Sequence, residues 1–330
     1  MPATTASDPT PGTPTGRTPS PPDDTSSPRE KDRFSRSRKE NRDGLLMVSP
    51  TVIVVIAVVV IPVLWNVLIA FQDLSFLQIR EASPFRPLTL DNFREVLGAR
   101  GFWTSMVTTV VYSIASTVGS IALGLLAALA LRDKFPGRGI VRSAMLLPYV
   151  APVVAVAFVW QVMLNTQYGI VNVWGQRFLG WDHAQDFLGV EPLALLTVIA
   201  FETWRYFPFA FMFLLARLQA IPRDITEAAI VDGATPWQRF RHILLPQLAS
   251  VIALLAVLRL IMTFNKFDDV YLLTGGTAGT EVAAVRVYDY LTGRFDAGAA
   301  AAQAVVLSLV MVVFLLIYLK WLSRTEREDA

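Results

Sequence analysis

The stretch LLMVSPTVIVVIAVVVIPVLWNVLIA, residues 45–70, decides the class of fold, because it is predominantly apolar and carries no charge. At 1.5 Å of rise per residue, about 20 predominantly apolar residues suffice for a helix to cross the hydrocarbon core of a bilayer. The stretch is too long, and lies too deep in the chain, to be the core of a cleavable signal peptide. It therefore predicts a membrane-spanning helix.

Similar apolar segments recur along the rest of the chain. Further spans are expected at residues 102–131, 143–165, 193–216, 243–264 and 298–319. Backbone polar groups in lipid must be satisfied within the segment itself, which favours helices. The 330 residues are 53% apolar and only 17% charged, whereas an average soluble domain has about 25% charged residues. The sequence predicts an all-α integral membrane protein with six transmembrane helices, over residues 44–322.

Composition also excludes several kinds of site. The chain has no cysteine, so disulfides, thiolate metal sites and thiol catalysis are excluded. Its two histidines, His183 and His242, are too far apart in sequence to suggest a pair of metal ligands, and no metal site is expected. The net charge of +2 gives no support for nucleic-acid binding. The spans hold no His/Asp or Ser/Lys constellation, so we expect no catalytic residues.

The distribution of Lys and Arg predicts the orientation. Residues 1–43 are rich in Pro, Ser and Thr and then basic, a composition typical of a disordered tail, and residues 323–330 form a short C-terminal tail. The two tails and the connections 132–142 and 217–241 hold 18 Lys and Arg, against 8 in the other three connections. Such residues tend to remain on the cytoplasmic side. We therefore expect a multi-pass protein of the cell membrane with both termini in the cytoplasm.

The connection between the fourth and fifth spans contains helix start and stop signals. In IPRDITEAAIVDGATPWQRF, residues 221–240, Asp224 can cap a first short helix, with Glu227 completing a capping box. Gly233 follows where a left-handed residue ends a helix, and Thr235 can cap a second short helix with Gln238. Two short helices with a break predict a rigid elbow. These signals leave open whether the elbow docks a partner or shields the membrane surface.

This connection resembles the signature loop of the permease subunits of bacterial ATP-binding-cassette importers. That pattern is Glu-Ala-Ala, three residues, Gly, nine residues, Ile, any residue, Leu-Pro. The residues that match it, with the acid before the glycine, are Glu227, Ala228, Ala229, Asp232, Gly233, Ile243, Leu245 and Pro246. Other stretches resemble the maltose-type, sugar-importing branch of the family: LPYVAPVVAVAFVWQVMLN, ETWRYFPFAFMFLLARLQAIP, TFNKFDDVYLLTGGTAG and FDAGAAAAQAVVL.

The resemblance implies a set of partners. It predicts that the loop, with its coupling helix, docks on a cytoplasmic ATPase and transmits the motion of that subunit to the spans. It also implies a second permease subunit as the other half of a heterodimer, two ATPase subunits and an extracytoplasmic substrate-binding protein. The chain contains no G-x-x-x-x-G-K-[ST] phosphate loop. ATP and Mg are therefore expected on the ATPase, with no cofactor bound by this chain.

Three charges within the spans need an explanation, since each costs about 2.5–3.5 kcal/mol at the membrane centre. Glu202 and Arg205 lie three residues apart and can neutralise each other on one helix. Arg259 has no acid in register on its own helix, so it either pairs across helices or faces the transport pathway. Glu202 is the only carboxylate inside a span, which disfavours a secondary transporter driven by protons or sodium.

The resemblance further predicts which side chains line a cavity for the cargo. In the fourth and fifth spans these are Arg205, Tyr206, Phe209, Arg259, Met262, Thr263 and Lys266. Aromatic faces and hydrogen-bonding groups suit a hydroxyl-rich sugar, which the resemblance favours. The three cations leave open an anionic cargo of the glycerol phosphate type. The cargo and the partner permease are not specified by these residues.

The second span carries a stripe of small residues. Ser116, Ser120 and Gly124 recur at intervals of four, so they lie on one face of a helix. Small residues permit close approach of two transmembrane helices. The stripe predicts tight packing, either within this chain or at a subunit interface.

Overall fold

The computed structural model describes residues 47–328, and these residues form helices joined by turns. Within this range the only β pairing is an isolated antiparallel bridge between Ser75 and Asp296. The all-helical prediction is thus confirmed for the described residues. The chain divides into two compact units, residues 1–62 and 63–330. The expected N-terminal tail, residues 1–43, lies outside the described residues.

The first apolar stretch forms a helix over Met47–Ala70, with a π-helical segment, η1 (Ile56–Val60), before α2 (Ile61–Ala70). Its side chains are exposed from residue 51 to residue 65. A helix that is apolar on all sides and exposed on all sides suits contact with lipid or with another transmembrane helix. The expected span at residues 45–70 agrees with this helix over the described residues.

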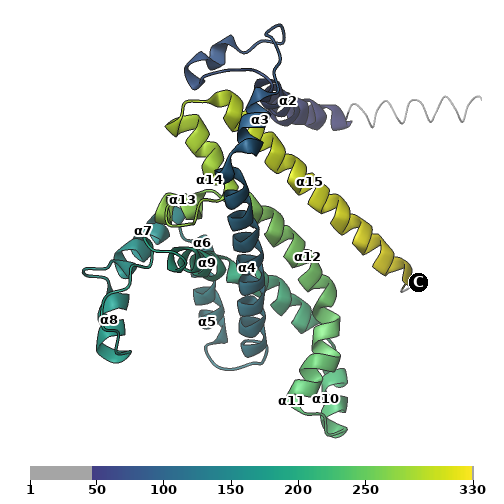
Figure 1. Ribbon diagram of the computed structural model, residues 1–330. Helices are drawn as coiled ribbons and strands as arrows, with labels where there is room; N and C mark the ends of the chain where they lie inside the picture. Colours follow the sequence, from purple (N-terminus) through teal and green to yellow (C-terminus); the bar gives the residue numbers. More distant parts are fainter. Residues whose placement is uncertain (1–46, 329–330) are drawn as a thin grey trace, which may run out of the picture. The chain divides into compact units, whose positions relative to one another are not determined.

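Four further helices of the second unit are long and apolar enough to cross a membrane (Figure 1). They are α4 (Arg100–Ala130), α9 (Leu193–Ala220), the continuous helix Pro236–Phe264, and α15 (Ala297–Glu328), of which Ala297–Tyr318 is the apolar part. The shorter helices are η2 (Phe76–Glu81), α3 (Asp91–Gly98), α8 (Ile170–Phe178), α10 (Arg223–Val231), α13 (Asp268–Thr274), α14 (Ala283–Tyr288) and η4 (Asp289–Gly293).

The third expected span, residues 143–165, is not one helix. The chain forms α5 (Arg138–Met145) and α6 (Leu147–Val150), and then turns by 94° into α7 (Val153–Leu164). Pro152 precedes α7, and its missing N–H removes the bond that would continue the helix. Pro148 and Pro152 predict a kink or a broken hydrogen bond in this span, and the structure has a sharp bend there. The described residues give five long apolar helices, or six spans if the bent pair counts as one.

The stripe of small residues on α4 packs within the chain. Ser116, Ser120 and Gly124 are all buried, and α4 lies beside α9. A methyl group on Gly124 would lie 2.8 Å from Cβ of Ala210 and 2.8 Å from the backbone nitrogen of Phe211. Only glycine allows the two backbones to come this close. The small-residue prediction is confirmed as an intramolecular contact.

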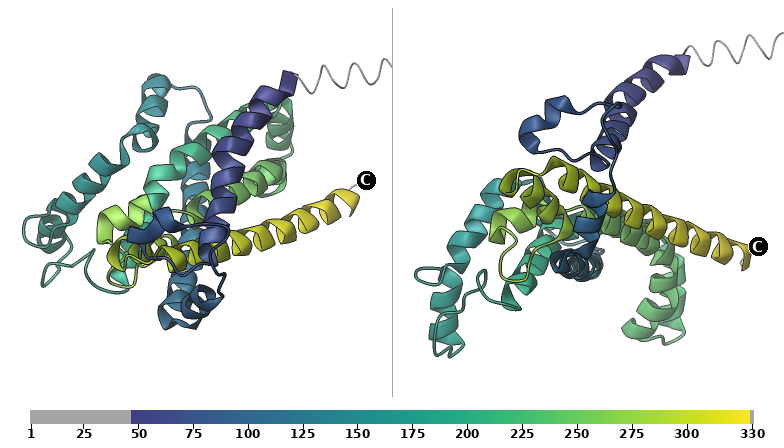
Figure 2. Two further views of the ribbon diagram at one scale, coloured as in Figure 1. Left: turned by 90° about the horizontal axis from the view of Figure 1, so that it is seen from above. Right: turned by 45° about the horizontal axis from the view of Figure 1, so that its top comes forward.

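Buried apolar side chains surround the region where α9, Pro236–Phe264 and α13 meet. One cluster joins the C-terminal parts of α4 and α9 to the N-terminal part of α12 (Leu245–Phe264). It includes Phe211, Leu214 and Leu248. Another joins α4, α9 and α13 through Tyr112 and Phe201. Figures 1 and 2 show α10 at one end of the helix Pro236–Phe264, and α13 and α14 at the other. The charged residues of the spans lie between these apolar clusters.

Candidate functional site

The first arm of the elbow, residues 221–240, is the helix α10. The residue before it is Pro222, in an extended conformation, and no side chain caps the helix. Asp224 lies inside the first turn, so the expectation that it is the N-cap is wrong. Pro222 lacks an N–H and has a fixed φ, so it separates α9 from α10. No side-chain hydrogen bond is needed to mark the start of α10. The acid in the first turn still interacts favourably with the helix dipole.

The break between the two arms has the predicted glycine conformation. Gly233 has φ +79°, a left-handed value. Its N–H donates to the carbonyl of Ile230 (3.0 Å), and the N–H of Ala234 donates to the carbonyl of Ala229 (2.9 Å). A Cβ at Gly233 would meet nothing within 4 Å. Glycine is therefore favoured here by backbone conformation rather than by lack of space.

The second arm begins with the predicted capping box. The N–H of Gln238 donates to the hydroxyl of Thr235 (3.3 Å), and the N–H of Thr235 donates to Oε1 of Gln238 (2.8 Å). The helix that starts there does not stop, however. From α11 (Pro236–Arg239) it continues through the π-helical segment η3 (Phe240–Leu244) into α12.

This continuity changes one expectation. The second arm is not a separate short helix, because the helix that contains the expected fifth span, residues 243–264, already begins at Pro236. Ile243 and Leu245 are half-buried and Pro246 is exposed, all within the wall of this long helix. The elbow is therefore one short helix, α10, joined by a single glycine turn to a helix of 29 residues.

The expected coupling residues of α10 and its turn are mostly exposed. Glu227, Ala228, Asp232 and Gly233 are exposed, and Ala229 is half-buried. Neighbouring Val231 is 88% exposed, although it is apolar. α10 therefore has an exposed surface within the described part of the chain. Pro222 precedes the helix, and the left-handed Gly233 follows it.

The charges of the spans form a network across helices. Nη2 of Arg259 on α12 lies 2.7 Å from Oε1 of Glu202 on α9, and neither side chain is exposed at all. Nη1 of Arg205 donates to the carbonyl of Ala151 at the bend before α7 (3.3 Å), and its Nε lies 4.0 Å from Oδ1 of Asp269. The expected pair of Glu202 with Arg205 is wrong, because the packing of α12 on α9 brings a closer cation to Glu202.

Tyr206 lies at the centre of this network. Its hydroxyl accepts a hydrogen bond from Nζ of Lys266 (2.6 Å), and the guanidinium of Arg259 lies 4.0 Å from the centroid of its ring. Lys266 also pairs with Asp268 (3.1 Å) and Asp269 (3.4 Å). Burial alone lowers the pKa of Lys266, but the nearby acids, together with Tyr206, raise it above its ordinary value. Lys266 therefore stays charged at neutral pH.

Five of the seven expected pathway residues come together here. They are Arg205, Tyr206, Arg259, Thr263 and Lys266. Phe209 is half-buried one turn further along α9, against the rings of Tyr149 (6.0 Å) and Phe213 (5.0 Å). Met262 is 42% exposed and makes none of the contacts of the network.

Several buried polar atoms of the network have no hydrogen-bond partner among the described residues. They are Nε and Nη1 of Arg259, Oε2 of Glu202, Nε of Arg205 and both carboxylate oxygens of Asp269. Buried polar groups in proteins are normally hydrogen-bonded, to protein or to water. The network thus contains both donors and acceptors whose hydrogen-bonding capacity is not used by the described residues.

The sequence interpretation did not identify Asp269 as a member of this network. Asp269 is fully buried, in the first turn of α13. Lys266 lies in the turn between α12 and α13, and this turn brings its Nζ within 3.4 Å of the Asp269 carboxylate. Spacing along the chain alone does not predict this contact.

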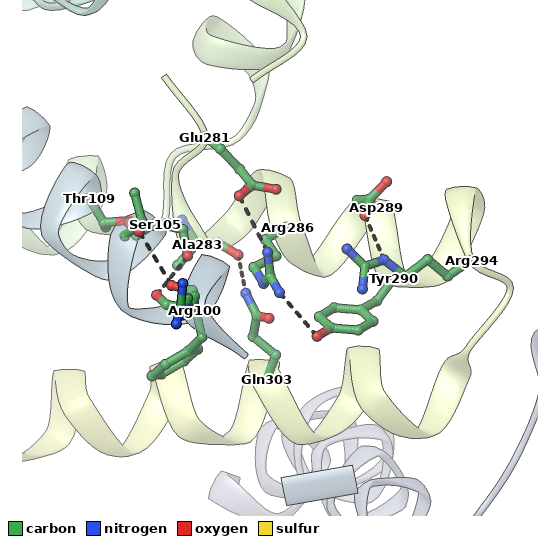
Figure 3. Close-up of polar contacts among 12 residues, drawn as sticks. Arg100, Ser105, Thr109, Glu281, Ala283, Arg286, Asp289, Tyr290, Arg294 and Gln303 are labelled. Carbon is green, nitrogen blue, oxygen red and sulfur yellow. Dashed lines mark hydrogen bonds and ion pairs between the residues drawn. The ribbon is translucent and has the colours of Figure 1, made fainter. Parts of the chain in front are cut away.

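A second buried polar cluster, also absent from the sequence interpretation, fixes the start of α14 (Figure 3). The backbone N–H of Ala283 donates to the hydroxyl of Thr109 on α4 (2.8 Å), and its carbonyl accepts from Gln303 on α15 (2.8 Å). Arg286 lies 3.4 Å from Glu281 and donates to the hydroxyl of Tyr290 (3.3 Å). A lone Gln within the alanine run at residues 299–304 is the sequence signal for this contact.

Comparison with known proteins identifies relatives over most of the chain. Residues 120–328 match the family described as binding-protein-dependent transport system inner membrane component. The chain is 35% identical to the trehalose/maltose transport system permease protein MalF of Thermococcus litoralis, over 86% of this chain and 94% of that protein. It is 33% identical to the sn-glycerol-3-phosphate transport system permease protein UgpA of Agrobacterium fabrum, over 68% and 76%.

A solved structure shares the fold. It is that of a bacterial ABC transporter involved in the import of the acidic polysaccharide alginate. The TM-score is 0.75 at 23% sequence identity, and the match covers 88% of this chain and 99% of that chain. At this identity the likeness concerns the fold alone.

Proposed function

The chain belongs to the family of binding-protein-dependent transport system inner membrane components, and from this premise we propose that it is the permease subunit of an ATP-driven saccharide importer. Permease subunits of this family are non-catalytic, multi-pass membrane proteins, so the chain is a transport component and not an enzyme. The proposed transporter contains a second permease, two ATPase subunits and an extracytoplasmic binding protein. The ATPase subunits bind ATP and Mg.

The exposed elbow is the observation that carries the proposed coupling. α10 presents an exposed surface, while its turn is fixed by Gly233 and its partner arm by the capping box at Thr235. A small helix joined without a break to a long transmembrane helix can transmit a displacement as a rigid body. We assign the elbow to the cytoplasmic side, in agreement with the Lys and Arg distribution, with α10 docked on the ATPase.

The charge network supports a pathway for a hydroxyl-rich cargo. Its unpartnered donors and acceptors lie on α9, α12 and α13, and the ring of Tyr206 lies within the same network. Arg259 and Thr263 are buried in this structure, so a cargo reaches them only after these helices separate. Alternating access, driven by the ATPase, supplies that separation in our proposal.

The coupling role is tested by Glu227→Ala and Gly233→Ala in the transporter assembled from all its subunits. Both variants should reduce substrate-stimulated ATP hydrolysis in vesicles by about tenfold and weaken co-purification of the ATPase. Gly139→Ala is the matched control for glycine, because its Cβ also meets nothing within 4 Å and its φ is not left-handed. Asp224→Asn, one turn before Glu227, is the control for loss of an exposed acid. Unchanged coupling in both test variants would remove the elbow from this role.

The cargo is tested by uptake in a strain that lacks the transporter and is complemented with it. Labelled trehalose and maltose are compared with labelled sn-glycerol 3-phosphate, the solutes named for the two relatives. We expect saccharide uptake that excess glycerol phosphate does not inhibit. If only glycerol phosphate is taken up, the cargo is an anion and not a saccharide. The cations Arg205, Arg259 and Lys266 suit such an anion.

A further inference from the structure

A cavity of about 520 Å³ lies beside the elbow, apart from the charge network. Its walls come from the end of α9, from α10 and α11, and from the connection between α4 and α5. Four cationic side chains line it, Arg132, Lys134, Arg138 and Arg239, against two acids, Asp133 and Glu227. The lining thus carries an excess of positive charge.

The four cations have few partners within the part of the chain that the structure describes. Among the described residues, none of the four forms an ion pair with a carboxylate. Nε of Arg239 is buried and has no hydrogen-bond partner in this part of the protein. Unpaired cations that face one cavity concentrate positive potential there and attract an anion.

Two of the arginines are held in place by neutral groups. Nη1 of Arg138 donates to the carbonyls of Arg132 and Asp133 (3.2 Å each), and Nη2 of Arg132 donates to the hydroxyl of Thr226 on α10 (3.3 Å). These bonds fix the guanidinium groups and leave their charge uncompensated. Planar guanidinium groups held in this way suit the oxygens of a phosphate.

The cavity lies where two apolar helices end. α4 ends at Ala130 and α9 at Ala220, and the cavity is lined by residues that follow α4 and by residues at the end of α9. Two apolar residues close in sequence to these cations are exposed: Phe135 (40% exposed), which follows Lys134, and Ile140 (79%), two residues after Arg138. Cationic groups next to exposed apolar side chains at the end of a span are typical of a surface that contacts lipid headgroups and acyl chains.

We propose that this cavity binds the phosphate of an anionic phospholipid from the membrane leaflet on the side of the elbow. The arginines and Lys134 hold the phosphate, and Phe135 and Ile140 contact the acyl chains. The alternative occupant, an acidic segment of the ATPase, explains the positive charge but not the exposed apolar residues beside it. The proposal rests on the orientation proposed above and not on the identity of the cargo.

The test uses the complete transporter in nanodiscs of zwitterionic lipid that contain increasing fractions of phosphatidylglycerol. Bound phosphatidylglycerol is measured by native mass spectrometry for the parent and for R239Q and K134Q. Each cation near a membrane surface contributes about 1 kcal/mol to the binding of an anionic lipid, so each variant should bind about fivefold more weakly. R241Q is the matched control: it removes an exposed charge two residues along the same helix, outside the cavity, and should change binding less than twofold.

Three results would overturn the proposal. The first is equal loss of phosphatidylglycerol in R239Q and R241Q, which would indicate general surface attraction. The second is full displacement of the lipid by millimolar inorganic phosphate, which would indicate a site for a soluble anion. The third is release of the ATPase from R239Q in purely zwitterionic nanodiscs, which would indicate that an acidic segment of that subunit occupies the cavity.

Discussion

At the scale of single residues, the ion pair of Glu202 with Arg259 joins two transmembrane helices where no solvent reaches either side chain. Removing one partner of a buried pair leaves the other charge uncompensated, at a cost of about 3–5 kcal/mol. Replacing both partners by neutral groups of similar volume is often close to neutral. We therefore expect the protein to tolerate replacement of both partners better than replacement of either one alone.

We expect Arg259→Met to lower the melting temperature of the purified transporter strongly, because Glu202 is then buried without its cation. The double variant Glu202→Gln, Arg259→Met should recover most of that loss. Thermal unfolding of each variant in the same detergent measures both effects.

Arg94→Met is the control for the loss of an arginine from an ion pair. The Arg94–Asp91 pair has side chains that are 78% and 75% exposed, and such pairs contribute about 1 kcal/mol or less. If the double variant melts as low as Arg259→Met alone, the buried pair is not the source of the instability.

The charged residues also show what spacing along the chain can and cannot predict. That a charge within a span needs a partner follows from the cost of burying it, and Glu202, Arg205 and Arg259 all have partners. Which partner each takes depends on how α9 and α12 pack, and spacing within one helix does not contain that information. For this reason the i,i+3 pairing of Glu202 with Arg205 was wrong.

At the scale of elements, the contact of α4 with α9 depends on the absence of a side chain at Gly124. Gly124→Ala places a methyl group 2.8 Å from backbone and Cβ atoms of α9, and the helices must separate. We expect this overpacking to destabilise the protein by about 1–3 kcal/mol, measured as a lower melting temperature. Gly98→Ala, whose Cβ meets nothing within 4 Å, is the control. An equal melting temperature for both variants would contradict the close contact.

The capping box of the elbow supports a prediction about coupling. Thr235→Ala removes the acceptor of the Gln238 N–H, at a cost of about 1 kcal/mol to the start of the helix. We expect lower substrate-stimulated ATP hydrolysis by the assembled transporter, whereas Thr235→Ser keeps the hydroxyl and should retain it. Equal hydrolysis by the two variants would mean that the cap does not contribute to transmission.

Local sequence signals predicted the turn and the second helix start of the elbow, but not the length of the helix that follows. Gly233 and Thr235 mark the turn and the cap because each satisfies backbone groups within a few residues. The same signals do not tell where the second helix ends, since Pro246 is tolerated in the long helix through the π-helical segment before it. The kink expected at Pro152 is a bend of 94°, a size that the sequence does not specify. A proline in a span indicates a broken hydrogen bond but not an angle.

At the scale of the whole molecule, the class of fold was predictable because it follows from composition and length. Long apolar segments can satisfy their backbone in lipid only as helices, and the described residues are helical. The network of α9, α12 and α13 and the contacts of Ala283 join residues far apart in sequence. They depend on tertiary packing, and spacing along the chain does not identify which residues meet.

The central claim is that this chain transports its cargo only when an ATPase drives it through the elbow. The most direct measurement is uptake of labelled saccharide against a gradient in liposomes, with the chain alone and with its partner permease, ATPase and binding protein. We expect uphill uptake only from the complete set, only with ATP inside the liposomes, and reduced uptake when the chain carries Gly233→Ala. Uphill uptake by the chain alone without ATP would contradict the account.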